Sequence, residues 1–363
     1  MVFANETILH VDLSKLEENL NYLKSKLKPQ TKIIAVVKAY AYGHGDLEVS
    51  KKLEQLNVFA LWVSDFEEGL ILRRSGIKTK IIVANPGLKS CAEINKYKLD
   101  VVLYNHKLLD LYCANKNKTD VHIKFNTGMN RYGFNKNDIY SIIKKINKNH
   151  HLNLVSICSH LSASENKNRP EYTLKQIEDF KVISNNFEVV FGRKLDKHIL
   201  NSHGVLNFSK FQMDGVRLGI GLYGSTNDAN LKQISSLTSV IAQIRELKKG
   251  DCIGYETSFI AKEKMKIGIV PVGYADGLNR QFSNTIGVVL VKNCTCSIVG
   301  KISMDSFVID ITKCEAKEGD LVEIFGKNLS VSEMAKKINT IPYEIYSTLN
   351  RRIKRVYSHS KRL

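Results

Sequence analysis

The sequence predicts an α/β protein with an N-terminal (β/α)8 barrel and a C-terminal, mostly-β domain. Through the first two-thirds of the chain, eight short β-branched runs alternate with helical patterns, which is the order that a barrel of parallel strands requires. After about residue 232 the β runs follow one another through turns, with few helical patterns between them. The length of 363 residues also favours two domains, because single cores stop growing at roughly 250–300 residues.

The barrel elements can be assigned in order. Ser14-x-x-Glu17 is typical of a capping box, and leucines continue behind it at helical spacing. Further helices are expected over residues 136–149 and 172–186. The expected barrel strands are residues 33–38, 58–63, 80–84, 100–104, 120–125, 152–159, 196–200 and 214–218.

The second domain is expected over residues 233–363, after a barrel domain of residues 1–232. Its β runs include MKIGIVPVGY, TIGVVLV and SFVIDI, and one helix is expected near Ser330–Ile338. Residues 1–12 lie before the first barrel helix and are candidates for pairing with the β domain.

The net charge of +18 raises the question of a nucleic-acid partner. The lysines are spread along the whole chain, and the densest basic stretch is confined to Arg351–Arg362. No zinc-finger or RRM-type signature accompanies the charge. We therefore expect a solvated basic surface and no nucleic-acid partner.

The sequence favours a cytoplasmic protein that neither enters a membrane nor binds a structural metal. No apolar run reaches the ~18 residues of a membrane helix, and the N-terminal segment lacks the pattern of a secretory signal. The seven cysteines are odd in number and contain no CxxC pair or zinc spacing, so we expect free thiols.

Candidate catalytic groups follow the ends of the predicted strands, where barrel enzymes carry their active sites. Lys38 ends an apolar strand, and partial loss of solvation there would lower its pKa and free an amine for Schiff-base formation. Ser202 and the glycine-rich segment beyond Arg217 follow the last two strands, where such barrels frequently bind phosphate. Hydroxyl and backbone N–H groups suit an anion.

Eight segments resemble, in order, the signature segments of alanine racemases. They cover the chain from about residue 30 to 355, and the first resembles the lysine motif that binds pyridoxal 5′-phosphate (PLP) in that family. The segments are VVKAYAYGHG, FNTGMNRYGF, SHLSASE, DGVRLGIGLYG, GYETSF, PVGYADG, VGKISMDSFVID and PYEIYSTLNRR.

The resemblance implies a role for particular residues of this chain. Lys38 would hold PLP as a Schiff base and act as one base, and Tyr255, donated by the partner subunit of a homodimer, would act as the second. Arg217 would face the pyridine nitrogen, and His160 would lie against the ring and contact the catalytic tyrosine. The implied phosphate-binding residues are Tyr42, Ser202, Gly219, Ile220 and Tyr343, with Asn201 beside them; Arg131 and Met304 would bind the substrate carboxylate, and Tyr274 would line the entrance.

Racemisation removes the α-proton from one face and returns a proton to the other, so two bases on opposite sides suit the reaction. Arg217 is only a hydrogen-bond donor and should leave the pyridine nitrogen unprotonated, which disfavours transamination. The resemblance also implies that Lys124, brought near Arg131, carries a carbamate. The implied product, D-alanine, would supply peptidoglycan.

The sequence departs from the family at Tyr40, Asn126 and His203-Gly204, where asparagine, aspartate and small alanines are common. Four alternatives stay open: a racemase of broader substrate range such as serine, a PLP-dependent decarboxylase, a non-catalytic PLP carrier and a nucleic-acid-binding module. Tyr343 favours alanine because it would narrow the pocket, Arg217 and Tyr255 argue against the decarboxylase, and the β domain argues against the carrier.

Overall fold

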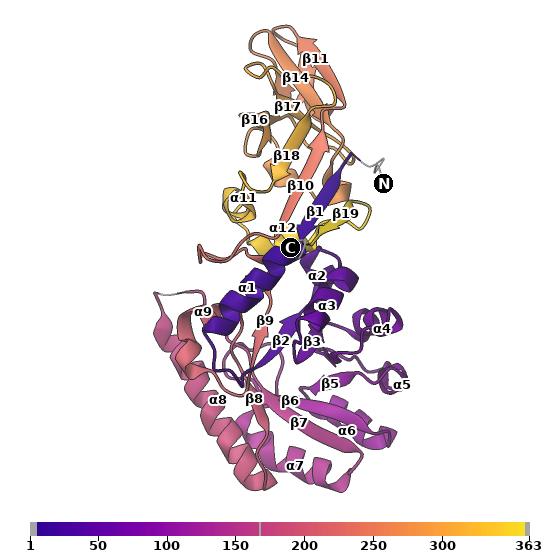
Figure 1. Cartoon of the computed structure of the whole chain (residues 1–363), viewed down its shortest axis with the longest axis vertical. Helices are drawn as coiled ribbons and strands as arrows, with labels where there is room; N and C mark the ends of the chain where they lie inside the picture. The colour runs from indigo at the N-terminus through magenta and orange to yellow at the C-terminus, as the bar shows by residue number, and fades with distance from the viewer. Residues whose placement is uncertain (1–5, 167, 360–363) are drawn as a thin grey trace. The chain divides into compact units, whose positions relative to one another are not determined.

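The computed structural model describes residues 6–166 and 168–359, which divide into two compact units (Figure 1). The barrel unit consists of Glu17–Ala41 and Asp46–Leu222. The β unit consists of the N-terminal residues up to Leu16, the short segment Tyr42–Gly45 and the chain from Tyr223 onward.

The barrel unit contains a closed barrel of eight parallel strands, which confirms the predicted fold class. Every strand overlaps one of the runs predicted from the sequence, and most strand residues are buried because the barrel interior and the surrounding helices cover both faces. The strands are β2 (Lys32–Val36), β3 (Ala60–Val63), β4 (Lys80–Val83), β5 (Asp100–Leu103), β6 (Thr119–Lys124), β7 (Leu152–Cys158), β8 (Asp196–His198) and β9 (Gly215–Leu218).

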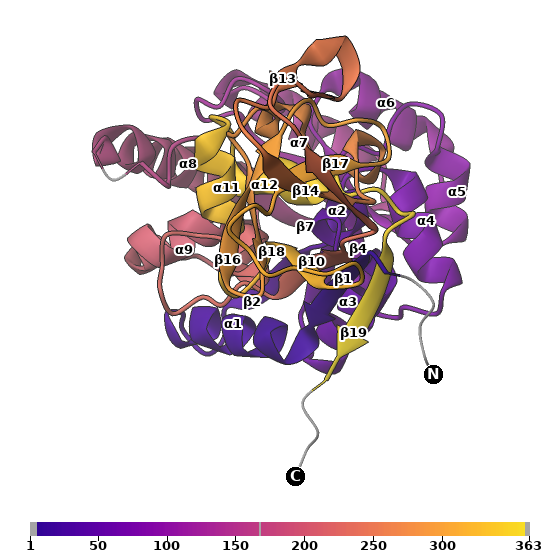
Figure 2. The ribbon, with the colours of Figure 1, turned by 90° about the horizontal axis from the view of Figure 1, so that it is seen from above.

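Helices surround the barrel, as α3, α4, α5 and α6 show in Figure 2. α7 illustrates why they form: Ile139, Ile142, Ile143 and Ile146 recur at helical spacing and all four are buried. The helices are α1 (Leu13–Ser25), α2 (Lys38–Tyr42), α3 (Asp46–Gln55), α4 (Phe66–Arg74), α5 (Cys91–Lys96), α6 (His106–Asn115), η1 (Lys136–Asp138), α7 (Ile139–Lys148), α8 (Pro170–Phe191), α9 (Ser202–Phe208), η2 (Ser209–Phe211) and α10 (Ile220–Tyr223).

The predicted capping box of the first helix is wrong. α1 begins at Leu13, one residue before the predicted cap. The carboxylate of Asp12 accepts hydrogen bonds from the backbone N–H of Ser14, at 3.0 Å, and of Lys15. Aspartate is as good a cap as serine, so the sequence pattern contained two candidates. Glu17 instead forms an ion pair with Lys52.

The β unit contains a nine-stranded sheet in the order β11-β14-β17-β16-β15-β18-β10-β1-β19, and a two-stranded ribbon, β12-β13. β1 lies between β10, with which it is antiparallel, and β19, with which it is parallel. The strands are β1 (Ile8–Asp12), β10 (Ser235–Val240), β11 (Gln243–Leu247), β12 (Cys252–Ile253), β13 (Phe259–Ile260), β14 (Met265–Val270), β15 (Val288–Val291), β16 (Cys294–Val299), β17 (Phe307–Asp310), β18 (Leu321–Phe325) and β19 (Lys354–Ser358).

Short helices connect these strands, and one of them confirms the helix expected near Ser330: α11 has the Ser330 side chain as its N-cap. The others carry several of the candidate site residues. The helices of the β unit are η3 (Tyr255–Thr257), η4 (Tyr274–Asp276), η5 (Arg280–Phe282), α11 (Val331–Lys337) and α12 (Pro342–Ser347).

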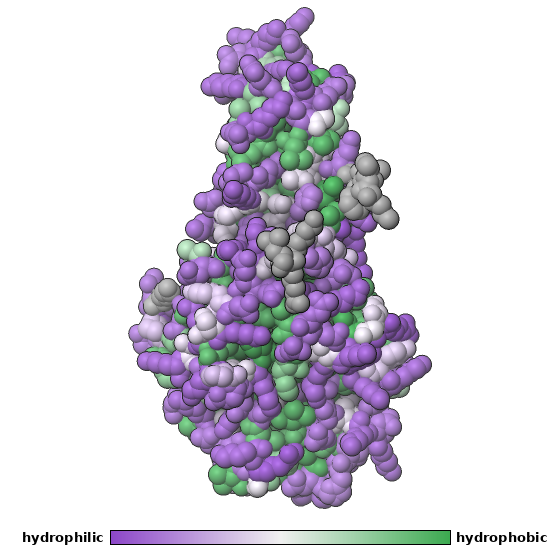
Figure 3. All heavy atoms as spheres, viewed as in Figure 1, coloured by the Kyte–Doolittle hydropathy of each residue, from purple (hydrophilic) through white to green (hydrophobic). Residues whose placement is uncertain are grey.

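The surface agrees with the composition: the face shown in Figure 3 is mostly hydrophilic on both units. Among residues 6–166 and 168–359, no helix combines the length and apolarity that a membrane span requires. All seven cysteines fall within this part of the chain, and each is a free thiol, as predicted.

Candidate active site

Lys38 begins a left-handed turn directly after β2, two residues beyond the end of that strand. Ala39, Tyr40 and Ala41 have φ angles of 52°, 57° and 51°, and Tyr42 follows at 53°. This conformation costs roughly 1–2 kcal/mol per residue for L-amino acids other than glycine. Strain of this kind persists where the surroundings hold it, most often at functional sites. The turn therefore marks Lys38 as a candidate independently of any motif.

Glu68 on α4 holds the start of this turn. One carboxylate oxygen accepts a hydrogen bond from the backbone N–H of Ala39 at 2.6 Å, and the other accepts from the N–H of Ser64 at 2.7 Å. The carboxylate thus joins the loops that follow β2 and β3. The sequence interpretation missed Glu68, although Asp65-x-x-Glu68 at a helix start was a visible signal, and Asp65 does cap that helix.

The surroundings of Lys38 favour a neutral amine. Burial of its stem and the nearby guanidinium of Arg131 lower the pKa of Lys38, while the carboxylate of Glu68 opposes this shift. A neutral amine is the form that attacks a carbonyl or accepts a proton. The geometry supports the expectation that Lys38 is poised for imine and base chemistry.

Lys124 at the end of β6 lies in the same cationic surroundings. Burial lowers its pKa to about 8, and the positive charges of Arg217, Arg131 and Lys38 act in the same direction. Cys158 opposes the shift. At pH 7 roughly a tenth of this amine is therefore neutral, far more than for a free lysine. The neutral amine is the form that can react with carbon dioxide.

The loop that carries Arg131 is folded back onto the end of β6. The N–H of Phe134 donates to the carbonyl of Lys124 at 2.8 Å, and the N–H of Asn126 donates to the carbonyl of Phe134. The side-chain oxygen of Asn126 accepts from the N–H groups of Gly128 and Asn130, as an aspartate could. Its amide nitrogen also donates to Asn130, which an aspartate could not do. Asn126 thus replaces the family's aspartate without loss of the turn.

His160 and Arg217 contact each other: an Nη2 hydrogen of Arg217 points to Nδ1 of His160 at 3.3 Å. Arginine has no acceptor, so Nδ1 must be the unprotonated nitrogen. Burial and then the charge of Arg217 lower the pKa of His160 well below its usual range, and Lys124 and Arg131 add to the effect. His160 is consequently a neutral imidazole whose Nε2–H is available as a donor.

Ser202, at the start of α9, accepts hydrogen bonds from backbone N–H groups that follow β9. Its hydroxyl oxygen accepts hydrogen bonds from the N–H groups of Gly219, at 2.9 Å, and Gly221, at 3.1 Å. A Cβ at Gly221 would come within 3.2 Å of that hydroxyl, so the backbone approach requires a small residue. Ile220 between the two glycines is buried. Asn201 caps α9 by accepting from the N–H of Gly204 at 2.8 Å, a structural role.

In the β unit, Tyr42 packs against Tyr343 of α12, with ring centroids 5.7 Å apart, and against Tyr223 at 4.7 Å. Burial, together with the neighbouring Tyr343, raises the pKa of Tyr42 above its usual range. The phenol therefore keeps its proton and remains a hydrogen-bond donor. This suits the predicted contact of Tyr42 with a phosphate.

Three further predicted residues, Tyr255, Tyr274 and Met304, line one pocket of about 550 Å³ in the β unit, together with Arg280 and Asp305. All three are exposed, and Tyr255 exposes 70% of its surface. Such exposure of a large aromatic side chain is typical of binding surfaces. The structure thus brings together residues that are up to 49 positions apart in the sequence (255 and 304).

The turn that carries Met304 is locked to the turn that carries Tyr274. The N–H groups of Tyr274 and Ala275 donate to the carbonyls of Ser303 and Met304, both at 3.0 Å. A Cβ at Gly273 would lie 2.1 Å from the Met304 carbonyl, which explains the glycine. The N–H of Met304 itself donates to no group in the described part of the chain, so this backbone donor is free to meet an anion.

Asp305, for which the sequence suggested no role, receives one from its contact with Arg352. The guanidinium of Arg352 bonds both carboxylate oxygens of Asp276, at 2.6 and 3.0 Å, and reaches Asp305 at 2.7 Å. Bidentate pairs of this kind fix geometry as well as add energy. Arg352, itself missed in the sequence, therefore ties the two turns of the pocket to the C-terminal segment.

Comparison with known proteins identifies the family. Residues 11–227 match the family model for the alanine racemase N-terminal domain, and residues 234–357 match that for the alanine racemase C-terminal domain. The chain belongs to the alanine racemase family. It is therefore an isomerase, as the sequence predicted.

Individual relatives agree with this assignment. Alanine racemase 2 of Caldanaerobacter subterraneus is 34% identical over 368 residues, which cover 97% of this chain and 94% of the relative. The structure of alanine racemase from Clostridium difficile 630 superposes with a TM-score of 0.93 at 31% identity, covering 99% of this chain and 97% of the other. The alanine racemase of Bartonella henselae, solved with covalently bound pyridoxal phosphate, gives 0.89 at 28% identity, with 97% and 99% coverage.

Alanine racemases depend on PLP, and the residues of this chain fit that cofactor. Lys38 is an amine with a lowered pKa, Ser202 and its neighbouring glycines gather a hydroxyl and N–H groups, and Tyr42 retains a phenolic proton. These are the groups that an imine link and a phosphate require. Arg217 adds a buried cationic donor, and no carboxylate of the described residues forms an ion pair with it.

Proposed function

We propose that this enzyme interconverts L- and D-alanine by a two-base mechanism, with Lys38 and Tyr255 on opposite faces of the substrate. The proposal rests on two sets of groups with complementary chemistry, one in each unit. The barrel unit holds a lysine biased toward its neutral form beside a phosphate cradle. The β unit presents an exposed phenol in a pocket with an unpaired backbone N–H.

Bound PLP would withdraw electrons from the α-carbon of the amino acid and so make its proton removable. In this proposal Lys38 binds the cofactor as a Schiff base, and Tyr42, Ser202, Gly219, Ile220 and Tyr343 hold its phosphate, with Asn201 beside them. Arg217, a donor only, faces the pyridine nitrogen and leaves that nitrogen unprotonated.

Lys38 takes the α-proton from D-alanine, and Tyr255 takes it from L-alanine. A free phenol has a pKa of about 10 and needs help to act as a base near neutral pH. His160 provides that help, because its neutral imidazole directs Nδ1 to Arg217 and leaves Nε2–H to donate to a phenolate. The charge of Arg217 behind the imidazole strengthens this donor.

Arg131 and the N–H of Met304 bind the substrate carboxylate, and Tyr274 lines the entrance. Lys124, with its pKa of about 8, carries a carbamate that turns a repelling cation into an anion beside Arg131. Mass spectrometry under mild conditions would show this modification as the added mass of one carbon dioxide.

A homodimer completes the site in this proposal, because Tyr255 then reaches the barrel of the partner subunit. The exposure of Tyr255, Tyr274 and Met304 supports a surface that another chain covers. The division into a PLP-binding domain of residues 1–232 and a donating domain of residues 233–363 belongs to the same proposal. The extents of the two family-model matches support it.

We further propose that the enzyme acts in the cytoplasm and that its D-alanine serves peptidoglycan synthesis. Among substrates, alanine is favoured over serine because Tyr343 would narrow the pocket, and the names of the relatives agree.

An assay of the purified protein with PLP and L-alanine tests the proposal, with D-amino-acid oxidase reporting the product. We expect D-alanine to form, and L-serine to react more slowly. A protein that binds PLP but leaves both amino acids unchanged would contradict the proposed activity.

A further inference from the structure

Arg217 presents a physical problem that the proposed mechanism does not solve. Its side chain lies in the barrel with only 4% of the residue exposed, and no carboxylate of the described residues lies within ion-pair distance of it. The Trp62 ring lies 5.3 Å from the guanidinium carbon. A buried charge is costly unless it is paired and fully hydrogen-bonded. The compensation comes from neutral acceptors. These are the carbonyls of Ser159, His198 and Ile199 and the Nδ1 atom of His198.

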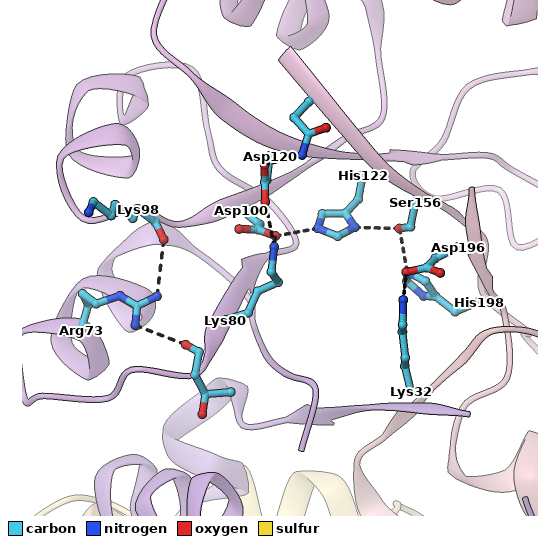
Figure 4. Close-up of polar contacts among 12 residues, drawn as sticks. Lys32, Arg73, Lys80, Lys98, Asp100, Asp120, His122, Ser156, Asp196 and His198 are labelled. Carbon is cyan, nitrogen blue, oxygen red and sulfur yellow. Dashed lines mark hydrogen bonds and ion pairs between the residues drawn. The ribbon is translucent and has the colours of Figure 1, made fainter. Parts of the chain in front are cut away.

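Barrel interiors are usually filled with branched apolar side chains, but five successive strands of this barrel each contribute a buried polar group. Starting from β9 and proceeding through β8, β7, β6 and β5, these residues are Arg217, His198, Ser156, His122 and Asp100, all less than 9% exposed. Figure 4 shows the part of this row from His198 to Asp100.

The hydrogen bonds of the row run without a gap. An Nη1 hydrogen of Arg217 points to Nδ1 of His198. Nε2 of His198 lies 3.1 Å from the Ser156 hydroxyl, which lies 2.6 Å from Nδ1 of His122. Nε2 of His122 lies 3.1 Å from a carboxylate oxygen of Asp100.

Chemistry at the two ends fixes the direction of every bond. Arginine only donates, so Nδ1 of His198 accepts and its single proton sits on Nε2, which donates to Ser156. At the other end Asp100 accepts, so Nε2 of His122 donates. In the singly protonated ring Nδ1 then accepts from the Ser156 hydroxyl. Burial and the charge of Arg217 lower the pKa of His198 well below its usual range, which agrees with a neutral ring. One arrangement therefore satisfies all five groups.

A local irregularity of the backbone makes the row possible. The pairing of β6 with β7 shifts between Val121 and His122, so that Val121 lies opposite Leu154 but His122 lies opposite Ser156. A regular register would place His122 opposite Val155. Bulges of this kind re-aim side chains and are typical of functional regions.

The far end of the row is anchored at the amino-terminal ends of the strands. The ammonium of Lys80 bonds Asp100 at 2.9 Å and Asp120 at 2.8 Å (Figure 4). Asp100 thus faces two donors, Lys80 and His122. The buried cation of Arg217 and this carboxylate are connected by three neutral groups, each polarised in the same sense.

We propose that Asp100, His122, Ser156 and His198 are positioning residues that form one directed hydrogen-bond relay, which holds Arg217 in a single orientation and charge state toward the cofactor. The relay itself does not depend on the proposed function. Only its effect on the pyridine nitrogen rests on the proposed role of Arg217. The carbonyls of Ser159, His198 and Ile199 also accept from Arg217, so loss of a link loosens the guanidinium at its bond to His198 without releasing the side chain. The pyridine nitrogen could then take up a proton, and transamination would compete with racemisation.

The test uses Ser156→Ala in the full-length PLP-bound enzyme, since it removes one hydroxyl from the middle of the relay and little volume. His122→Asn breaks the relay at another link and guards against an effect peculiar to one variant. Asp120→Asn is the matched control, because Asp120 bonds the same Lys80 but is not part of the relay.

Two measurements are made on each variant. The first is nitrogen-15 NMR of labelled histidines, where the relay predicts that His122 and His198 are Nε2–H tautomers in the wild type. In Ser156→Ala the Nε2–H of His198 loses its acceptor, so its nitrogen-15 and proton resonances should shift. The second is the number of racemisation events per conversion of bound cofactor to its pyridoxamine form with release of pyruvate. We expect this ratio to fall roughly 10-fold in both relay variants, the effect of one unsatisfied buried hydrogen bond, and to stay unchanged in Asp120→Asn.

Wild-type histidine signals and a wild-type ratio in Ser156→Ala would overturn the relay, as would an equal change in the Asp120→Asn control. A purely structural role would lower thermal stability and total activity in all variants without moving the ratio. If the wild type neither bound PLP nor racemised alanine, the proposed function would fail, while the NMR measurement would still decide the relay.

Discussion

The two units contribute to the candidate site in opposite ways. The barrel unit holds buried titratable groups that lie close together and whose pKa values are lowered, such as Arg217 and the neutral imidazole of His160. The β unit instead presents exposed side chains on locked turns, with Tyr255, Tyr274 and Met304 open to solvent. This contrast indicates that the barrel unit has groups suited to bind a cofactor and control its charge. The β unit has exposed groups suited to contact another molecule.

The contribution of the barrel unit is removed most severely by Lys38→Ala. The variant loses both the amine that binds the cofactor and one of the two bases, so racemisation should fall by at least about 10³-fold. The visible absorbance of the bound cofactor should disappear with it. Lys107→Ala, on the exposed face of α6, should keep both; activity within a few-fold of wild type in Lys38→Ala would remove the lysine from the mechanism.

The contribution of the β unit is removed by Tyr255→Phe, which deletes the phenolic proton acceptor but keeps the ring. Racemisation should fall by about 10²- to 10⁴-fold, the usual contribution of a general base. Exchange of the D-alanine α-proton with deuterated water should continue, because Lys38 is unchanged, while exchange from L-alanine should stop.

The control for this variant is Tyr140→Phe, since Tyr140 on α7 has nearly the same exposure, 68% against 70%. It should behave as wild type in both exchange directions. Equal loss of exchange from both enantiomers in Tyr255→Phe would contradict the assignment of one base to each face.

The lowered pKa of Lys124 in the barrel unit predicts smaller effects on stability and on KM. Its pKa of about 8 lies below that of free lysine, so the folded state releases a proton and stability rises with pH between about 8 and the unfolded pKa near 10.4. The neutral amine that forms as pH rises toward 8 reacts with carbon dioxide. Bicarbonate should lower KM for alanine by about 2- to 5-fold, the worth of a partly exposed charge pair.

Lys124→Arg supplies the comparison, because a guanidinium cannot form the carbamate under these conditions. Its KM should not respond to bicarbonate at any pH. A response equal to that of the wild type would place the carbon dioxide effect elsewhere in the protein.

The smallest effect concerns the strained turn that follows Lys38. Tyr40 has a φ of 57°, and asparagine adopts this conformation more readily than tyrosine. Tyr40→Asn should stabilise the protein by about 1 kcal/mol and raise Tm by roughly 1–2 °C. Tyr40→Ala, which lacks the local hydrogen bonding of asparagine, should not; a Tm gain in both variants would mean that removal of the tyrosine ring, and not the turn, is responsible.

Much of the barrel was predictable because its strands are buried on both faces and appear as separate apolar runs. All eight expected strands are present. Lys38 follows β2, Arg217 lies on the adjacent strand β9, and Lys124 ends β6 elsewhere in the barrel. The helix cap at Asp12 was mistaken for one at Ser14 because aspartate and serine are equally good N-cap residue types, and only Asp12 accepts the backbone N–H groups here.

What the sequence could not show depends on contacts between distant segments. Asp65-x-x-Glu68 indicates a helix start but not that Glu68 bonds the backbone of Ala39. The ties of Arg352 to Asp276 and Asp305 carry no local signal. The relay from Arg217 to Asp100 also escaped prediction. A one-residue bulge at His122 aligns its side chain, and no hydrophobic pattern reports such a shift.

The central claim, that Lys38 of one subunit and Tyr255 of its partner serve one substrate, is tested most directly by mixing two inactive variants. Lys38→Ala and Tyr255→Phe are dissociated, combined in equal amounts and allowed to reassociate. Half of the dimers should be mixed, and each of these has one intact site, so activity should return to about a quarter of wild type. A mixture that contains mixed dimers yet stays inactive would contradict an active site shared between two subunits.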